Sequence, residues 1–194
     1  MFYNNPIYNF LLERKSSSEI IFIPENLWTG NPDEGKKIVD GFLSFNGEGV
    51  LFDKNVWKKN SASKSWNEEL NAFEWIKNVR SLGTNKARVF LRDNIREWMK
   101  FQSRWDPLFW RNDILARRIF NLMSNMSFFY NTADEDFQKR FTKLLNKQSI
   151  HLVETHKKKN YGDKKIFIVK AIILASLSFK NLSGKFQLGI SLLK

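Results

Sequence analysis

Apolar residues recur on two faces of a helical wheel between residues 65 and 83, and this pattern constrains the fold more than any other feature. Ser65 and Glu68 form a capping box at the start of the segment, and Gly83 suits the position just after its end. One stripe holds Trp66, Leu70 and Phe73, and the other holds Ala72, Trp75, Ile76, Val79 and Leu82. A helix that is apolar on two sides has to be packed between neighbouring elements. The chain is therefore expected to form layers of helices.

Five further helices are predicted after residue 83 from capping residues and apolar spacing. Their expected starts, in chain order, are Thr84, Asn112 or Asp113, Thr132 with Glu135, Asp163 and Ser183. The first two are expected to end near Phe101 and Met126. Successive helices with short connections favour antiparallel helix pairs over a closed bundle. The fold class is therefore mainly α.

Residues 1–60 show a different pattern, with short apolar runs separated by Pro, Gly and Asn. This composition predicts extended chain and turns. The dipeptide Asn46-Gly47 is a strong hairpin signal, because both residues tolerate positive φ, and it predicts a hairpin of Phe42–Phe45 and residues 50–52. Residues 58–64 are a polar linker. We therefore divide the chain into a small extended and hairpin segment, residues 1–60, packed on a helical domain, residues 61–194.

The chain is strongly basic, with 32 Lys and Arg against 20 Asp and Glu, a formal net charge of +12. A field of this sign concentrates anions such as nucleic acid, anionic lipid or acidic polysaccharide. The alternative is a lysine-rich solvated surface with no anionic partner. The positive residues are spread along the chain, apart from a run at residues 157–159, and a nucleic-acid arm is more often a block.

Several classes of protein are excluded by residues that the sequence does not contain. The chain has no cysteine, which rules out disulfides, thiolate catalysis and cysteine-based zinc sites. The most apolar window, residues 166–179, contains Lys170 and is shorter than the ~20 apolar residues of a membrane span. It predicts a buried helix. The first residues show no secretory signal pattern, which leaves the cytoplasm and the cell envelope open as locations.

Histidines and carboxylates give little support to catalysis or metal binding. His151 and His156 are five residues apart, so they do not share a helix face as metal ligands would, and a structural or solvated role is favoured. Acidic clusters at residues 67–70 and 134–136 are each expected in the first turn of a helix, where the dipole favours them. Neither a nucleotide-binding glycine loop nor a serine-nucleophile motif is present. We predict no cofactor and no metal.

The segment WDPLFWRNDILARR, residues 105–118, concentrates the remaining chemistry. Arginine offers a planar fork for carboxylate or sulfate, and the face of tryptophan can stack on a sugar ring or pack in a core. The loop before the predicted third helix carries Trp105, Trp110 and Arg111, beside a positive helix end that suits an anion. On the helix, Arg117 is expected to point away from the apolar arc, and Arg118 to lie on its boundary.

These features predict four substrate-binding candidates: Trp105, Trp110, Arg111 and Arg117. The alternative for the two tryptophans is that they plug the space between helices. Both interpretations remain open at the level of sequence.

An ordered set of short motifs resembles the amino-terminal helical region of bacterial heparinase II/III-like proteins. The motifs lie at residues 24–30 (P-x-x-L-W-x-G), 35–45 (G-x-x-I-x-x-G-x-x-x-F), 65–83, 87–88, 98, 110–119 (W-R-x-D-I-x-A-R-R-I) and 148–152 (Q-x-x-H-L). Each motif is weak alone, and their order and spacing carry the resemblance. It extends from about residue 20 to the end of the chain.

The resemblance implies an incomplete (α/α) toroid within a polysaccharide lyase that cleaves acidic, uronate-containing glycans by β-elimination. Such an enzyme neutralises the uronate carboxylate while a Tyr or His base removes the C5 proton. No position here matches the family's catalytic motifs, so no catalytic residue is expected within residues 1–194. The apolar pattern continues to Lys194, so we expect a fragment that is inactive without the rest of the protein. The alternative is a complete basic helical module that binds nucleic acid or another polyanion, which the sequence favours less.

Overall fold

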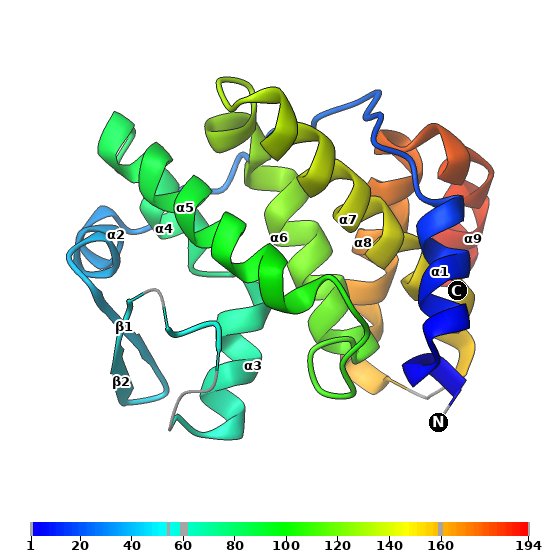
Figure 1. Ribbon diagram of the computed structural model, residues 1–194, viewed down its shortest axis with the longest axis horizontal. Helices are drawn as coiled ribbons and strands as arrows, with labels where there is room; N and C mark the ends of the chain where they lie inside the picture. The colour runs from blue at the N-terminus through cyan, green and yellow to red at the C-terminus, as the bar shows by residue number, and fades with distance from the viewer. Residues whose placement is uncertain (1, 54, 59–61, 159–160, 194) are drawn as a thin grey trace.

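The computed structural model describes residues 2–53, 55–58, 62–158 and 161–193, and these form a mainly helical chain with one small hairpin (Figure 1). The α-helices are α1 (Pro6–Lys15), α2 (Pro32–Val39), α3 (Lys64–Ala72), α4 (Ile76–Arg80), α5 (Asn85–Gln102), α6 (Asn112–Tyr130), α7 (Glu135–Thr155), α8 (Lys165–Ser178) and α9 (Phe186–Ser191). Among the described residues, short 3-10 helices accompany them: η1 (Phe2–Asn4), η2 (His156–Lys158), η3 (Gly162–Lys164) and η4 (Lys180–Lys185). The hairpin pairs β1 (Phe42–Phe45) with β2 (Glu48–Leu51).

Helix α6 runs through the middle of the molecule and packs against α3, α4, α5, α7 and α8 (Figure 1). Leu115 and Ile119 are fully buried, as predicted for its apolar arc. Only part of the opposite face is accessible: Ser124 and Asn125 are 4% and 1% exposed, whereas Arg117 and Asn121 are partly exposed. The prediction of an outward face is therefore confirmed for Arg117 and Asn121 and wrong for Ser124 and Asn125.

The two-sided apolar segment is buried as predicted, but it is two helices instead of one. Helix α3 ends at Ala72, its C-cap Phe73 adopts a left-handed conformation with φ of 59°, and α4 begins at Ile76. A non-glycine residue is strained there. The fully buried Phe73 ring offsets this cost by packing between Trp57 and Trp75, at centroid distances of 5.4 and 5.5 Å. The helix is capped by Ser63, two residues before the predicted cap Ser65.

The later helix starts agree with the predictions to within a few residues. Thr84 caps α5 by accepting a hydrogen bond from the backbone N–H of Ala87 at 3.2 Å. Helix α7 is capped by Asp134 instead of Thr132, whose hydroxyl bonds Arg92. The two last helices are each preceded by a short 3-10 turn, η3 before α8 and η4 before α9.

The first sixty residues contain the predicted hairpin, whose second strand is Glu48–Leu51 instead of residues 50–52, and two helices that were not predicted. Asn46 and Gly47 both have positive φ, 52° and 82°, which confirms the turn chemistry. Helices α1 and α2 each begin at an Asn-Pro pair, in which the asparagine side chain caps the helix and proline occupies its first turn. The same dipeptide also occurs in turns, and this explains why the segment was predicted as extended chain.

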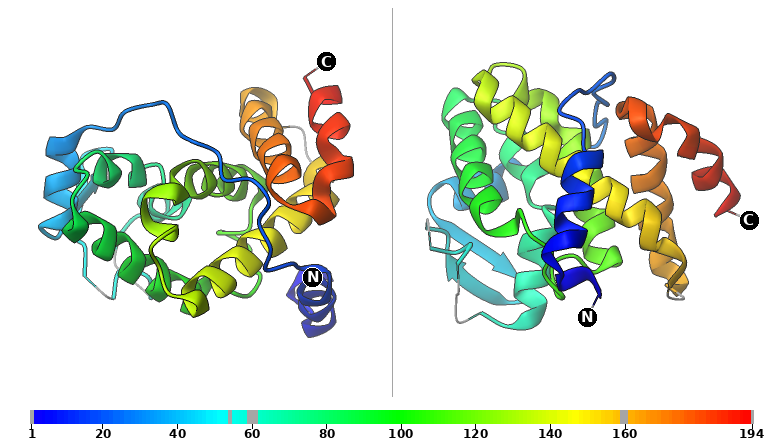
Figure 2. Two further views of the ribbon diagram at one scale, coloured as in Figure 1. Left: turned by 90° about the horizontal axis from the view of Figure 1, so that it is seen from above. Right: turned by 45° about the vertical axis from the view of Figure 1, so that its right-hand side comes forward.

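Residues 16–31 connect α1 to α2 as a strap across the helices (Figure 2). The backbone N–H of Ser17 donates to Asn146 Oδ1 at 2.8 Å, and that of Ile21 donates to the carbonyl of Ser178 at 2.9 Å. These two hydrogen bonds attach the strap to α7 and α8. The apolar window 166–179 forms α8, as predicted. Within the described parts of the chain, no helix is both long and apolar enough to cross a membrane.

Candidate functional site

A cavity of about 390 Å³ lies at the amino-terminal end of α6, where the sequence places the tryptophan and arginine segment. We call it the α6 pocket. Its lining comes from η1, the loop before α6, α6, α7 and the segment before α8: Tyr3, Trp105, Pro107, Trp110, Arg111, Asn112, Asp113, His151, Thr155, Tyr161 and Lys164. Three of the four predicted binding residues are therefore together. Arg117 does not line the cavity.

One wall of the α6 pocket is aromatic. Trp105 is partly buried and lies 6.0 Å from the ring of Tyr3, and Tyr3 meets His151 edge-on at 5.2 Å. Trp110 also meets His151 edge-on at 5.2 Å and is only 2% exposed, so it packs between helices, as in the alternative interpretation. Its indole Nε1 has no hydrogen-bond acceptor among the described residues. Of these two tryptophans, Trp105 is the one whose ring remains partly accessible.

His151 is held in this wall by Tyr8 of α1, whose hydroxyl lies 2.7 Å from Nδ1. Burial raises the pKa of Tyr8 well above its ordinary value, with a smaller contribution from Glu154. Both side chains are buried. The structural role predicted for His151 is the one that this geometry supports.

Three neutral side chains that line the α6 pocket are linked to one another by hydrogen bonds. Asn112 Nδ2 donates to the Tyr161 hydroxyl at 2.7 Å, and Thr155 Oγ1 lies 3.0 Å from Asn112 Oδ1. Because Tyr161 accepts from Asn112, its own hydroxyl hydrogen is left to point elsewhere, and no acceptor for it lies among the described residues. Burial raises the pKa of Tyr161, so the hydroxyl stays protonated at neutral pH. This hydroxyl can therefore donate a hydrogen bond, and Tyr161 lines the cavity.

Arg111 also lines the α6 pocket, but carboxylates already bind both sides of its guanidinium group. Nε and Nη2 donate to the Asp113 carboxylate at 2.9 and 2.7 Å, and Nη1 donates to Glu68 at 2.6 Å. Lys164 also binds Asp113, at 2.9 Å. Burial opposes ionisation of Asp113, but the hydrogen bonds from Arg111 and Lys164 outweigh it and hold the pKa well below its usual range. The formal charges of these four groups cancel, so the fork is closed to a substrate carboxylate.

Arg117 is also bound to carboxylates, on the surface where α6 meets α3. Its Nη1 and Nη2 donate to Glu69 at 2.9 and 2.6 Å, and Nη2 also donates to Glu74 at 2.9 Å. Glu68 and Glu69 were predicted to stabilise the first turn of a helix. They lie instead in the second turn of α3, because that helix begins at Lys64, and they bind Arg111 and Arg117.

Arg118 was predicted at the boundary of the helix and is fully buried. Its Nε donates to Gln148 Oε1 at 3.1 Å, Nη2 donates to the carbonyl of Phe109 at 2.8 Å, and the guanidinium lies 5.5 Å from the Trp98 ring. Burial lowers the pKa of Arg118 to about 9. No linear pattern could have revealed this, because Gln148 lies on α7 and Trp98 on α5.

Two further arginines stabilise the carboxyl end of α6. Arg88 Nε donates to the carbonyl of Phe128 at 2.9 Å, and Arg92 Nε donates to that of Phe129 at 2.7 Å. These cations satisfy carbonyls that the helix leaves unpaired and lie at the negative end of its dipole. Arg88 and Arg92 therefore stabilise the fold.

In the part of the chain that the structure describes, no group of three His, Asp or Glu residues could hold a metal ion.

Detectable similarity to a known protein covers about half of this chain. No family model matches it, and no solved structure matches it. A curated protein with detectable similarity is the FtsZ-localized protein C of Caulobacter vibrioides, which is 28% identical over 94 residues. The match covers 47% of this chain and 16% of that protein, so the chain spans a small part of the relative's length.

Proposed function

We propose that this chain is the amino-terminal helical part of a heparinase II/III-like polysaccharide lyase or a relative, and that its helix pairs belong to an incomplete (α/α) toroid. The ordered motifs and the mainly helical fold support the proposal. In it, the α6 pocket forms part of the wall that contacts an acidic glycan, while the catalytic residues lie in the rest of the protein. The observation that carries the proposal is the aromatic and hydroxyl-lined cavity itself.

The chemistry of the α6 pocket suits the hydroxyl groups and C–H faces of a saccharide. Trp105 offers an apolar ring for stacking, and the Tyr161 hydroxyl offers a donor. Because Arg111 is neutralised by Glu68 and Asp113, the uronate carboxylate is not expected to bind here. Arg111 thus acts as a positioning residue for the pocket, and the carboxylate is bound elsewhere in the full-length protein.

Trp105→Ala tests the saccharide site. We expect it to weaken the binding of uronate oligosaccharides from heparan or alginate about fivefold, because loss of a stacked ring costs on the order of 1 kcal/mol. Isothermal titration calorimetry measures the affinity. Trp28→Ala is the matched control, since Trp28 is 77% exposed and lies outside the pocket. In the full-length protein, absorbance of the unsaturated uronate product tests the lyase chemistry.

Equal affinities of wild type and Trp105→Ala would contradict the saccharide site. Tight binding of duplex DNA, insensitive to Trp105→Ala and steeply dependent on salt, would instead favour the polyanion-binding alternative. Absence of product absorbance on all uronate substrates would contradict the lyase activity.

A second candidate function is association with FtsZ, and the observation that favours it is the 94-residue similarity to an FtsZ-localized protein. Co-sedimentation with assembled FtsZ tests it. Retention of the chain in the pellet only when FtsZ is assembled would support this candidate. If the two functions use different surfaces, the Trp105→Ala variant should be retained as well as wild type. Recovery in the supernatant would count against it.

A further inference from the structure

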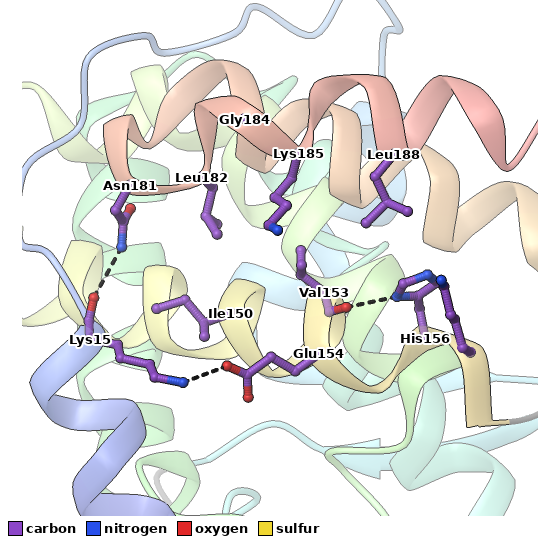
Figure 3. A pocket seen from close by; sticks show the side chains of 11 residues that line it. Lys15, Ile150, Val153, Glu154, His156, Asn181, Leu182, Gly184, Lys185 and Leu188 are labelled. Carbon is purple, nitrogen blue, oxygen red and sulfur yellow. Dashed lines mark hydrogen bonds and ion pairs between the residues drawn. The ribbon is translucent and has the colours of Figure 1, made fainter.

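A second cavity, of about 730 Å³, lies between α7 and the segment formed by η4 and α9 (Figure 3). We call it the η4 pocket. Its apolar lining consists of Ile150 and Val153 of α7, Leu182 of η4 and Leu188 of α9. None of its described lining residues is Phe, Tyr or Trp, in contrast to the α6 pocket. Its size lies within the ~300–1,000 Å³ of small-molecule sites.

Lysines surround this apolar lining, and their charges are only partly balanced. Lys15 binds Glu154 at 2.8 Å, which pairs one cation with one carboxylate. Lys157 and Lys185 also line the cavity, and neither has an ion-pair partner among the described residues. Figure 3 shows the Lys185 side chain pointing from η4 toward α7, across the hollow. The η4 pocket therefore carries an excess of positive charge over an apolar surface.

His156 adds an unsatisfied polar atom to the same wall. The side chain is 7% exposed, and Nδ1 lies 2.7 Å from the carbonyl oxygen of Val153. Because that carbonyl can only accept, Nδ1 must carry the hydrogen. Nε2 is then an acceptor in the neutral ring, and it has no partner among the described residues. A buried polar atom without a partner is costly, and a hydrogen-bonding ligand in the pocket would satisfy it.

We propose that the η4 pocket binds an amphiphilic organic anion. The anionic group lies between Lys157 and Lys185, and the apolar body covers Ile150, Leu182 and Leu188. The charged residues that line the pocket are Lys15 of α1, Glu154 of α7, Lys157 of η2 and Lys185 of η4. This site is independent of the saccharide proposal.

Calorimetric titration with decanoate tests the proposal, with octanoate, decanol and inorganic phosphate as comparison ligands. Octanoate should bind about 15-fold more weakly than decanoate, because two fewer CH₂ groups are buried. Decanol and inorganic phosphate, which lack the charge and the apolar body respectively, should each bind at least tenfold more weakly.

Lys185→Met is the decisive variant, because it removes a charge from an exposed side chain while keeping its apolar stem. We expect it to weaken decanoate binding about tenfold and leave decanol binding unchanged. Lys139→Met, on an exposed lysine of α7 outside the cavity, is the matched control and should bind decanoate like wild type. Decanol binding as tightly as decanoate, or equal affinities of the two lysine variants, would overturn the proposal.

Discussion

Replacing Trp98 by alanine is expected to lower the free energy of unfolding by about 3–5 kcal/mol, the usual cost of removing a large aromatic side chain from a core. Trp98 is fully buried on α5. Its ring meets Phe73 edge-on at 5.1 Å and lies 5.5 Å from the guanidinium carbon of Arg118. The substitution therefore leaves a cavity. It also removes the aromatic face that attracts the desolvated guanidinium of Arg118.

Chemical denaturation monitored by circular dichroism measures this effect. Trp28→Ala is the matched control: its ring is 77% exposed, so its removal should change stability by no more than about 0.5 kcal/mol. Trp98→Phe keeps a ring in the same place and should cost less than Trp98→Ala. If the Trp98→Ala and Trp28→Ala proteins were equally stable, Trp98 would not be the core residue described above.

Gly35→Ala should destabilise the protein by about 3 kcal/mol, at the upper end of the usual cost of overpacking a core. Gly35 lies on α2 where that helix packs against α4, and a Cβ atom built on it would be 2.1 Å from the carbonyl oxygen of Asn78. That neighbour is backbone and cannot rotate away. The methyl group would push α2 off α4 and weaken the bond that Asn78 Oδ1 accepts from the backbone N–H of Asn31, the cap of α2.

Thermal and chemical unfolding of Gly35→Ala, compared with Gly184→Ala, separates this clash from any general effect of the substitution. A Cβ atom on Gly184 meets nothing within 4 Å, so Gly184→Ala should be neutral or slightly stabilising. Two variants of equal stability would show that the contact between α2 and α4 can relax at little cost. The close approach also gives a physical reason for the glycine that opens the motif at residues 35–45.

The candidate site shows where sequence reasoning succeeded and where it could not. Trp105, Trp110 and Arg111 are close along the chain and precede a helix, so their placement at one helix end was predictable. The residues that contact them could not be predicted in this way. Glu68 reaches Arg111 from 43 residues away, and His151 reaches Trp110 from a different helix. The two arginines predicted to bind substrate are consequently bound within the protein.

The sequence by itself determined what depends on neighbours in the chain. The turn at Asn46-Gly47, the cap at Thr84 and the helical stripes follow from local φ preferences, capping hydrogen bonds and a 3.6-residue period. The tertiary structure decided the rest. It broke one helix at Phe73, buried Arg118 and neutralised Arg111, because burial and ion pairing depend on residues that only packing brings together.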